Sequence, residues 1–349
     1  MSLIQAFRDQ AVACTNLGSP FTGRVLNILA DSWNPTTVLG QNFARYQGDV
    51  GPAGHSLPLR LAGALHALVL LKRVPALVAA YPPERASDEA LRAAVEAAVK
   101  AEEPFLLHWT RTAPQTNEVR RSAALIAMAH VALHHFDLPI MLSELGASGG
   151  LNLMWDRFAL RAGDTMLGPV TPALTLDPDW TGPPPPAALP RVASRAGVDL
   201  NPLNPNDRHD LLRLSAFLWP DQPERLARTR AAAAVFDAKM HAGDAIDWLD
   251  TRLAQQPEGQ MHLIQNTVAW QYFPPDAQVR GAKLIAEKGA RATPRTPLGW
   301  MQMETDGDTS GAGGAALTLR LWPGDIALNL GRADFHGRWV RWGVERAQG

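Results

Sequence analysis

A stretch near the middle of the chain, residues 138–158, most constrains how the chain can fold. Its letters, LPIMLSELGASGGLNLMWDRF, contain an apolar run that ends in the acidic residue Glu144, then a glycine-rich turn, then a helix-like segment. Glycines at Gly146, Gly149 and Gly150 can bring backbone N–H groups close to a ligand at a helix N-terminus. The stretch therefore predicts a strand, a turn and a helix, in an arrangement that often builds a binding site.

Several interpretations of this turn remain open. The spacing Glu144-x-Gly146-x-Ser148-x-Gly150 resembles the first motif of the class I S-adenosylmethionine-dependent methyltransferases, in which an acidic residue precedes alternate small residues. The shorter spacing Gly146-x-Ser148-x-Gly150 formally matches the nucleophile elbow of α/β-hydrolases. A glycine-rich connection that binds nothing is the third interpretation, since short motifs also occur by chance.

The composition is that of an ordinary soluble protein and excludes some partners. The chain has 349 residues, 46% hydrophobic and 19% charged, with a formal net charge of -1. No basic surface for nucleic acid is expected from this balance. The N-terminus breaks its apolar stretch at Arg8 and Asp9, and no apolar run approaches about 18 residues. We therefore expect a cytoplasmic protein without a membrane span, and the lone Cys14 excludes an internal disulfide.

The pattern of apolar residues changes character along the chain. Residues 1–137 show helical spacing almost throughout, and this predicts an all-helical N-terminal cap region; the helical stretches are 22–31, 59–72, 88–102 and 119–136. Residues 138–349 are expected to form an α/β domain with strands and helices in alternation. A helix should continue from the glycine-rich turn to about Arg161. A proline-rich insertion at about 165–191 interrupts this domain and cannot be regular helix.

Further strands are expected downstream of the insertion. Val192–Leu200 is the first, and a long helical region should follow it through Met240. Later strands are expected before Asp244, over Met261–Val268 and over Trp300–Glu304. A helix from about 275 to 290 and a final antiparallel group of short strands over 317–342 complete a mixed, doubly wound sheet.

Polar residues at successive strand ends point to a nucleoside site. In a methyltransferase the cofactor lies across the carboxyl ends of neighbouring strands. Asp199 is placed to accept the ribose hydroxyls, Asp244 to accept the adenine amino group, and Asn266 to face the methyl group. Each residue alone is as readily a turn or cap residue. Their order, after Glu144 in the first strand, favours a site for S-adenosylmethionine.

Other polar residues are candidates for the substrate side and for catalysis. Gln115, Asn117 and Arg120 open an apolar helix, where helix capping and solvated charge are the alternative explanation. The remaining nominations share a position close to an expected strand end: Arg195 and Arg338 for substrate binding, and Asn266, Tyr272 and His336 for catalysis.

The hydrolase and metal hypotheses are weaker. Hydrolysis by Ser148 needs a histidine and an acid downstream, for which His336 with Asp334, or His262, can be nominated. No oxyanion-loop sequence precedes the serine. The three histidines in AHVALHHF, His130, His134 and His135, lack the carboxylate of a metalloprotease helix, so no metal is expected.

Longer motifs resemble a bacterial family of unknown function, DUF2332, over nearly the whole chain. They are QTNEVRR at 115–121, ELGASGGLNLMWDRF at 144–158, the segment 195–225 and the closing ADFHGRWVRW. This resemblance brings no established activity with it.

The resemblance to class I methyltransferases is separate and carries the functional expectation. It implies a Rossmann-like sheet that binds S-adenosylmethionine through Glu144, Gly146, Ser148, Gly150, Asp199, Asp244 and Asn266. The chain departs from this class at Ser148, in a long connection to the second strand, and in QNTVAWQYFPP, which lacks the Asn-Pro-Pro-aromatic motif of enzymes that methylate nucleic-acid bases. We therefore expect a small-molecule acceptor. A non-catalytic nucleotide-like binding or regulatory protein, and a serine hydrolase, are the alternatives.

Overall fold

The computed structural model describes residues 2–52, 54–308 and 313–346. They divide into a helical unit, Met1–Thr116 with Asp207–Ala227, and a sheet unit, Asn117–Asn206 with Arg228–Gly349. The division differs from the expected boundary at residue 137 in two ways. The helix over residues 122–135 packs on strands of the sheet, and residues 207–227 pack with the N-terminal helices.

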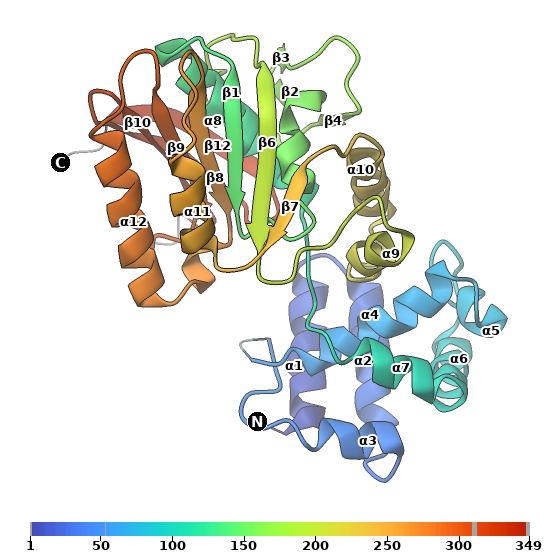
Figure 1. The fold of residues 1–349 in the computed structure, drawn as a ribbon. Helices are drawn as coiled ribbons and strands as arrows, with labels where there is room; N and C mark the ends of the chain where they lie inside the picture. The colour runs from blue at the N-terminus through green and yellow to red at the C-terminus, as the bar shows by residue number, and fades with distance from the viewer. Residues whose placement is uncertain (1, 53, 309–312, 347–349) are drawn as a thin grey trace. The chain divides into compact units, whose positions relative to one another are not determined.

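The helical unit contains the helices expected over 22–31, 59–72 and 88–102, whereas the one expected over 119–136 belongs to the sheet unit. Serines begin several of them as N-caps; the side chain of Ser19, for example, accepts a hydrogen bond from the backbone N–H of Thr22. The helices are α1 (Leu3–Asn16), α2 (Pro20–Asp31), α3 (Val38–Phe43), α4 (Leu57–Leu70), α5 (Pro75–Val78), α6 (Asp88–Ala101), α7 (Glu103–Trp109) and α9 (Arg208–Ala216), and α10 (Pro223–Ala234) begins in this unit (Figure 1).

Helix α4 forms the centre of the helical unit. It is mostly apolar, with Arg60 and His66 as buried polar residues, and Leu61, Leu65 and Leu68 have no exposed surface. Such a helix is stable only when other helices cover all its faces. Helix α9 is one of them, and His66 of α4 lies 3.1 Å from the carbonyl oxygen of Ala216 through its Nδ1 atom. This packing explains why residues 207–227 belong to the helical unit.

The sheet unit is built on a nine-stranded sheet with the order β5-β12-β11-β10-β9-β8-β1-β6-β7 (Figure 1). The pairs formed by β7, β6, β1, β8 and β9 are parallel, whereas β9 to β12 form an antiparallel meander. The strands are β1 (Ile140–Leu145), β5 (Asp179–Thr181), β6 (Val192–Asp199), β7 (Lys239–Ala242), β8 (Met261–Thr267), β9 (Leu298–Glu304), β10 (Ala315–Trp322), β11 (Ile326–Ala333) and β12 (Trp339–Arg346). The expected mixed α/β sheet is confirmed.

The order of the parallel strands creates a switch point beside β1. The chain adds β6 and then β7 on one side of β1, and later adds β8 and β9 on the other side. Loops that leave neighbouring strands in opposite directions open a crevice at the carboxyl ends of those strands. The four strands β1, β6, β7 and β8 all end at this edge, because their pairs are parallel.

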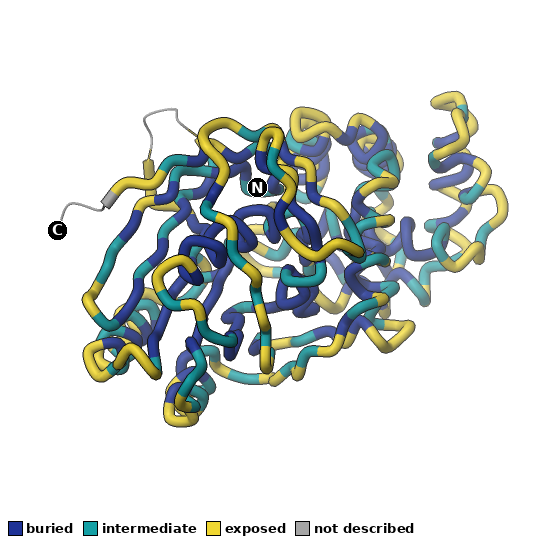
Figure 2. The backbone as a smooth tube through the Cα atoms, turned by 90° about the horizontal axis from the view of Figure 1, so that it is seen from above, coloured by how far each residue is buried: buried dark blue, intermediate teal, exposed yellow. Residues whose placement is uncertain are grey.

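Helices cover both faces of the central strands. On one face, Leu145 and Ile264 pack with Leu249 of α11 (Ala245–Leu253) and Ile285 of α12 (Pro275–Gly289). On the other face lie α8 (Ser122–His135), which follows the 3-10 turn η1 (Val119–Arg121), and the 3-10 helix η2 (Leu151–Arg157). Strands β1 and β8 are consequently buried along their whole length. Figure 2 shows the buried parts of the backbone in dark blue and the exposed parts in yellow.

Two expected helices end earlier than predicted. After the glycine-rich turn the chain forms η2 and then β2 (Phe158–Ala162), not a helix to Arg161. The two residues Gly163 and Asp164, with Gly163 at φ 61°, form a tight turn into β3 (Thr165–Leu167), and this turn chemistry favours a hairpin. With β4 (Leu174–Leu176) the hairpin forms a small sheet of order β3-β2-β4. Similarly, Met240 lies in β7, and not at the end of a helix.

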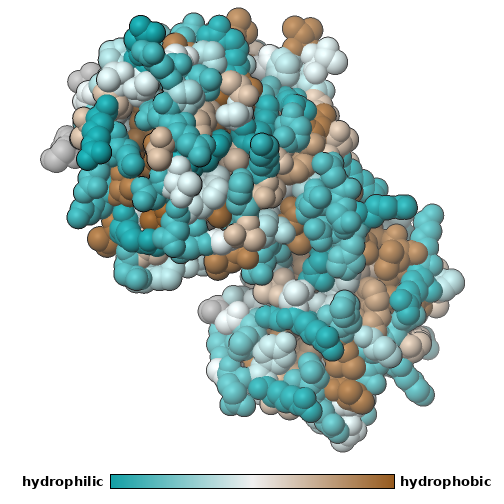
Figure 3. Space-filling model, viewed as in Figure 1, coloured by the Kyte–Doolittle hydropathy of each residue, from teal (hydrophilic) through white to brown (hydrophobic). Residues whose placement is uncertain are grey.

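The visible surface is mainly hydrophilic. Figure 3 shows apolar residues on this face in small scattered groups among hydrophilic ones. In the part of the chain that the structure describes, no helix combines the length and the apolar character that crossing a membrane requires.

A close contact beneath α12 allows a test of the packing. A Cβ atom at Gly289 would lie 2.4 Å from Cδ2 of Trp322, whose side chain is buried. We expect Gly289→Ala to lower the free energy of unfolding by about 1–3 kcal/mol, measured by urea denaturation, because the rigid indole must shift. Gly343→Ala is the control, since no atom lies within 4 Å of its added Cβ. Equal stability of the two variants would contradict this packing.

Candidate functional site

A cavity of about 290 Å³ lies at the carboxyl ends of β1, β6, β7 and β8. Four elements form its walls: the turn after β1, the end of β6, the loop between β7 and α11, and the segment between β8 and α12. The lining residues are Gly146, Asp199, Leu200, Gly243, Asp244, Ala245, Ile246, Val268, Ala269, Tyr272, Phe273, Pro274 and Ala277. The cavity is therefore at the position in the sheet where doubly wound proteins bind ligands.

The turn after β1 needs its glycines for two separate reasons. Gly146 and Gly150 have φ angles of 67° and 68°, in the left-handed region that favours glycine. A Cβ atom at Gly146 would lie 2.5 Å from the Cβ of Ala269, and one at Gly150 would lie 2.6 Å from the sulfur of Met240. Side chains at either position would push the turn away from its neighbours. Gly146 lines the cavity, whereas Gly150 packs behind it.

Asp199 connects the end of β6 to the turn after β1. One carboxylate oxygen accepts a hydrogen bond from the backbone N–H of Ser148 at 2.9 Å, and the other accepts from the N–H of Asn201 at 2.9 Å. The side chain is half-buried and lines the cavity. Each carboxylate oxygen has a second lone pair, so Asp199 can hold the turn and still accept a hydrogen bond from a ligand hydroxyl.

Asp244 occupies the corresponding position after β7. It is the N-cap of α11, and its Oδ1 atom accepts hydrogen bonds from the N–H groups of Ile246 and Asp247, both at 2.9 Å. Arg280 of α12 donates to the same oxygen at 3.0 Å. The backbone bond from Asp247 contributes most to a lowered pKa, so the exposed carboxylate is charged at neutral pH. Its Oδ2 atom accepts none of these three bonds.

The wall segment, which we define as residues 268–273, follows β8. Val268 has a φ angle of 52°, a strained value for a β-branched residue. Buried Glu304, at the end of β9, accepts hydrogen bonds from backbone N–H groups of this segment at 2.8 to 3.4 Å. Tyr272 is 75% exposed and Leu200, on another wall, is 73% exposed, so two large apolar side chains stand at the cavity with much of their surface open to a ligand.

Glu144 does not line the cavity. It lies within β1, is 2% exposed and bonds to Gln265 of the adjacent strand β8. Burial raises the pKa of Glu144 to about 8, and the bond from Gln265 and the charge of Arg121 only partly oppose this effect. Its Oε2 atom has no hydrogen-bond partner among the described residues.

Two other nominated cofactor residues, Ser148 and Asn266, are also absent from the lining of the cavity. Ser148 is a positive-φ residue whose backbone, not its hydroxyl, is bonded to Asp199. Asn266 is fully buried, donates to Glu304 at 2.9 Å and accepts from the indole N–H of Trp300 at 2.8 Å. Its partners lie on the side of the sheet covered by α11 and α12, and Asn266 is not among the lining residues of the cavity. Of the three nominated catalytic residues, Tyr272 alone appears in that lining.

The nominated substrate residues of the sheet unit serve mainly to connect segments. Asn117 accepts a hydrogen bond from the N–H of Leu151, directly after the glycine-rich turn, at 2.7 Å. Arg195 is almost buried and forms a two-bond ion pair with Asp156 at 2.5 and 3.1 Å. Both therefore hold the turn and η2 against neighbouring segments.

The remaining nominated residues also lie outside the lining of the cavity; they are Arg338, His336, Arg120 and Gln115. Arg338 pairs with Asp334 at 2.7 Å, and the same carboxylate accepts from the backbone N–H of His336 at 3.0 Å. Arg120 donates its backbone N–H to Glu118 at 3.2 Å, and Gln115 belongs to the helical unit.

The geometry around the serines does not favour hydrolysis. The hydroxyl oxygen of Ser148 is buried and has no hydrogen-bond partner among the described residues. His262 instead lies 2.8 Å from the hydroxyl of Ser143, to which Arg252 also donates at 3.0 Å. Burial and this nearby cation lower the pKa of His262 to about 3. An arginine beside the pair is opposite in charge to the carboxylate of a catalytic triad.

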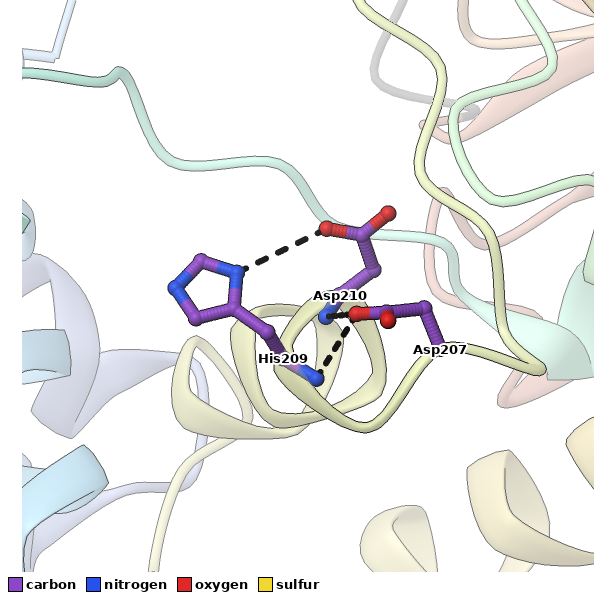
Figure 4. A group of neighbouring side chains, drawn as sticks. All are labelled: Asp207, His209 and Asp210. Carbon is purple, nitrogen blue, oxygen red and sulfur yellow. Dashed lines mark hydrogen bonds and ion pairs between the residues drawn. The ribbon is translucent and has the colours of Figure 1, made fainter.

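One group of side chains within the described ranges has ligand atoms close enough together to hold a metal ion. It consists of Asp207, His209 and Asp210 in the helical unit, and Figure 4 shows them at the start of α9. The carboxylate of Asp207 accepts hydrogen bonds from the N–H groups of the other two residues at 2.9 and 3.0 Å. These bonds are those of an ordinary N-cap, which accounts for the group without a metal.

Most residues of the cavity lining were not predicted from the sequence, Leu200 and Val268 among them, and neither was Glu304, which binds the wall segment. Leu200 and Val268 gave no signal, since an exposed leucine and a strained valine look ordinary in a sequence. Glu304 had one usable signal, its position as an acidic residue at the end of an expected strand, as with Asp199.

The buried carboxyl group of Glu144 predicts a pH-dependent stability. The pKa of Glu144 is about 8 in the folded protein and near 4.5 when unfolded, so its neutral form stabilises the fold in full below pH 4.5. That contribution is lost as the pH rises towards 8. We expect Glu144→Gln to stabilise the protein relative to wild type by a difference that grows over this range, measured by urea unfolding at several pH values.

The exposed residue Glu287 gives the matched control for this prediction. Glu287→Gln should leave the pH dependence of stability unchanged. A constant difference between Glu144→Gln and wild type from pH 4.5 to 8 would show that Glu144 titrates normally.

Comparison with known proteins identifies the family. The model of the family described as "Uncharacterized protein conserved in bacteria (DUF2332)" matches residues 4–342. No curated protein and no solved structure matches the chain. The matched range includes every wall of the cavity, and it covers nearly all of the 349 residues. The chain belongs to the DUF2332 family.

Proposed function

We propose that this protein is an S-adenosylmethionine-dependent methyltransferase that acts on a small-molecule acceptor. One observation carries the proposal: carboxylates at the ends of neighbouring strands, Asp199 after β6 and Asp244 after β7, line the same cavity as Gly146 after β1. A nucleoside that lies across the ends of neighbouring strands needs one acceptor for its ribose hydroxyls and a second acceptor, at the next strand end, for its amino group.

The order of the parallel strands supports a Rossmann-like interpretation. Numbered along the chain from β1, the strands β7, β6, β1, β8 and β9 follow the order 3-2-1-4-5 of doubly wound nucleotide-binding sheets. The antiparallel meander from β10 to β12 departs from that pattern at the edge of the sheet away from the cavity.

Each wall of the cavity has a distinct role in this proposal. Asp199 accepts hydrogen bonds from the ribose hydroxyls, and Asp244 accepts one from the adenine amino group. The turn at Gly146 contacts the methionine part, because a backbone without a side chain permits close approach. Leu200 and Tyr272 supply apolar surface for the planar base.

The charge of the cavity supports a cationic nucleoside over a phosphorylated one. The lining residues include two aspartates, and within the described chain no lysine, arginine or histidine is among them. Binding sites for phosphate normally supply arginine, lysine or a set of backbone N–H groups. A sulfonium ion is attracted by the same carboxylates that repel a phosphate.

Transfer would be a direct displacement. The nucleophilic atom of the acceptor forms a bond to the methyl carbon as the carbon–sulfur bond breaks, its electron pair returns to sulfur, and S-adenosylhomocysteine leaves. A proton leaves the acceptor to solvent or to a base. The protein contributes mainly orientation and exclusion of water, so a side-chain nucleophile is not required.

A non-catalytic nucleoside-binding protein is the second candidate. The observation that favours it is the placement of the nominated catalytic residues, since Asn266 is engaged with Glu304 and Trp300, and His336 is not among the lining residues. Binding of the cofactor without turnover of any acceptor in a screen would favour this candidate.

Isothermal titration calorimetry tests the proposed site. We expect wild type to bind S-adenosylmethionine, S-adenosylhomocysteine and adenosine, and to bind AMP at least about tenfold more weakly than adenosine because of the two aspartates. Asp244→Ala should weaken adenosyl binding by about 10- to 100-fold, the usual effect of losing a hydrogen bond to a charged group.

The control for Asp244→Ala is Asp247→Asn. Asp247 pairs with the same arginine, Arg280, but does not line the cavity, so its replacement should leave affinity unchanged. Absence of binding by wild type at millimolar ligand would refute the cofactor assignment.

A further inference from the structure

The carboxylate of Glu304 collects an unusual number of hydrogen bonds from one short piece of chain. Its Oε1 atom accepts from the N–H groups of Ala269 at 2.8 Å and Trp270 at 3.0 Å, and its Oε2 atom accepts from the N–H of Gln271 at 3.4 Å. The side chain of Asn266 donates to Oε1 as well, at 2.9 Å. Glu304 is 7% exposed, so these bonds form out of water, where they are strongest.

Three consecutive backbone N–H groups that face one anion form an anion-binding nest. In this protein the nest opens the 3-10 helix η3 (Trp270–Tyr272), and the anion comes from the chain itself, at the end of β9. The wall segment is thus attached through its backbone, and its side chains are left for other contacts. Tyr272 and Phe273 line the cavity directly beyond the nest.

The entry to the wall segment is strained, which makes this attachment necessary. Val268 holds a φ angle of 52° and donates its N–H to the carbonyl of Met303 at 2.8 Å. A left-handed valine is strained and persists only where the surroundings hold it. Met303 and Glu304 are neighbours in β9, so one strand end fixes both the strained residue and the nest.

We infer that Glu304 is a positioning residue, which fixes residues 268–273 as a wall of the cavity and thereby sets its affinity for an adenosyl ligand. This inference rests on the proposed function for the identity of the ligand. Glu304 does not line the cavity, so it acts through Tyr272 and Phe273. Without its charge the wall segment relaxes, and the surface offered to the ligand changes.

The test uses Glu304→Gln in the full chain, with S-adenosylhomocysteine as the probe in calorimetry. Glutamine keeps the shape of the side chain, but its NH₂ group opposes a backbone donor of the nest. We expect the affinity to fall about tenfold or more. Gln271→Ala is a second variant, because its side chain accepts from the N–H of Thr305 at 3.1 Å without lining the cavity, and a smaller loss is expected.

A spectroscopic signal reports the position of the wall segment independently of any ligand. The rings of Trp270 and Trp300 lie 5.1 Å apart at an angle of 64°, and the backbone of Trp270 is part of the nest. Near-ultraviolet circular dichroism of Glu304→Gln should therefore differ from wild type while the protein remains folded. A residue that only stabilised the fold would leave this signal unchanged below the unfolding transition.

Asp306→Asn is the matched control. Asp306 lies two residues beyond Glu304 and pairs with Arg332 at 2.7 Å, away from the nest, so its replacement should alter neither affinity nor the dichroism signal. Equal affinity of wild type and Glu304→Gln would overturn the inference, as would an equal loss in Asp306→Asn.

Failure of the proposed function gives a different result. In that case wild type binds no adenosyl ligand, and the role of Glu304 is decided by the tryptophan signal alone. An unchanged signal in Glu304→Gln would then overturn the positioning role.

Discussion

The hydrogen bond from the backbone of Ser148 to the carboxylate of Asp199 joins the turn after β1 to the end of β6, and the shape of the cavity depends on this contact. It holds the turn in a conformation that only glycine adopts easily at Gly146 and Gly150. Leu203 donates its N–H to the carbonyl of Ser148 at 3.1 Å, so the loop after β6 binds the same turn a second time. The cavity exists because this turn stays close to the strand ends without placing a side chain between them.

Carboxylates build the other walls in the same manner. Asp244 caps α11 and Glu304 fills the nest of η3, so each acidic side chain satisfies backbone N–H groups at the start of a helix or turn. This use differs from the usual arrangement of a phosphate site, in which the N–H groups stay available for the ligand. Because the chain supplies its own anions, the strand ends present oxygen acceptors and apolar surface to whatever enters.

Much of this arrangement was predictable from the sequence, for specific physical reasons. Strand β1 is a buried run that leads into the glycine-rich turn, and β6 ends in the buried residues 196–198 before Asp199. Parallel strands bring such ends to one edge, so Gly146, Asp199 and Asp244 were correctly expected near one another. The engagement of Asn266 was not predictable, because its two partners, Trp300 and Glu304, lie 34 and 38 residues away in the neighbouring strand β9.

Contacts that depend on distant backbone lie beyond a single sequence. The partners of Glu304 are N–H groups about 34 residues away, brought together only by the pairing of β8 with β9. The edge of the large sheet has a related consequence for how the protein is made. Strand β5 follows the small sheet in the chain but pairs with β12 of the large sheet, through Val340 opposite Trp180, although β12 follows it by about 160 residues. During synthesis β5 must wait for the last strand, so a nascent chain carries an unpaired strand edge until then, a state in which pairing with another chain competes with folding.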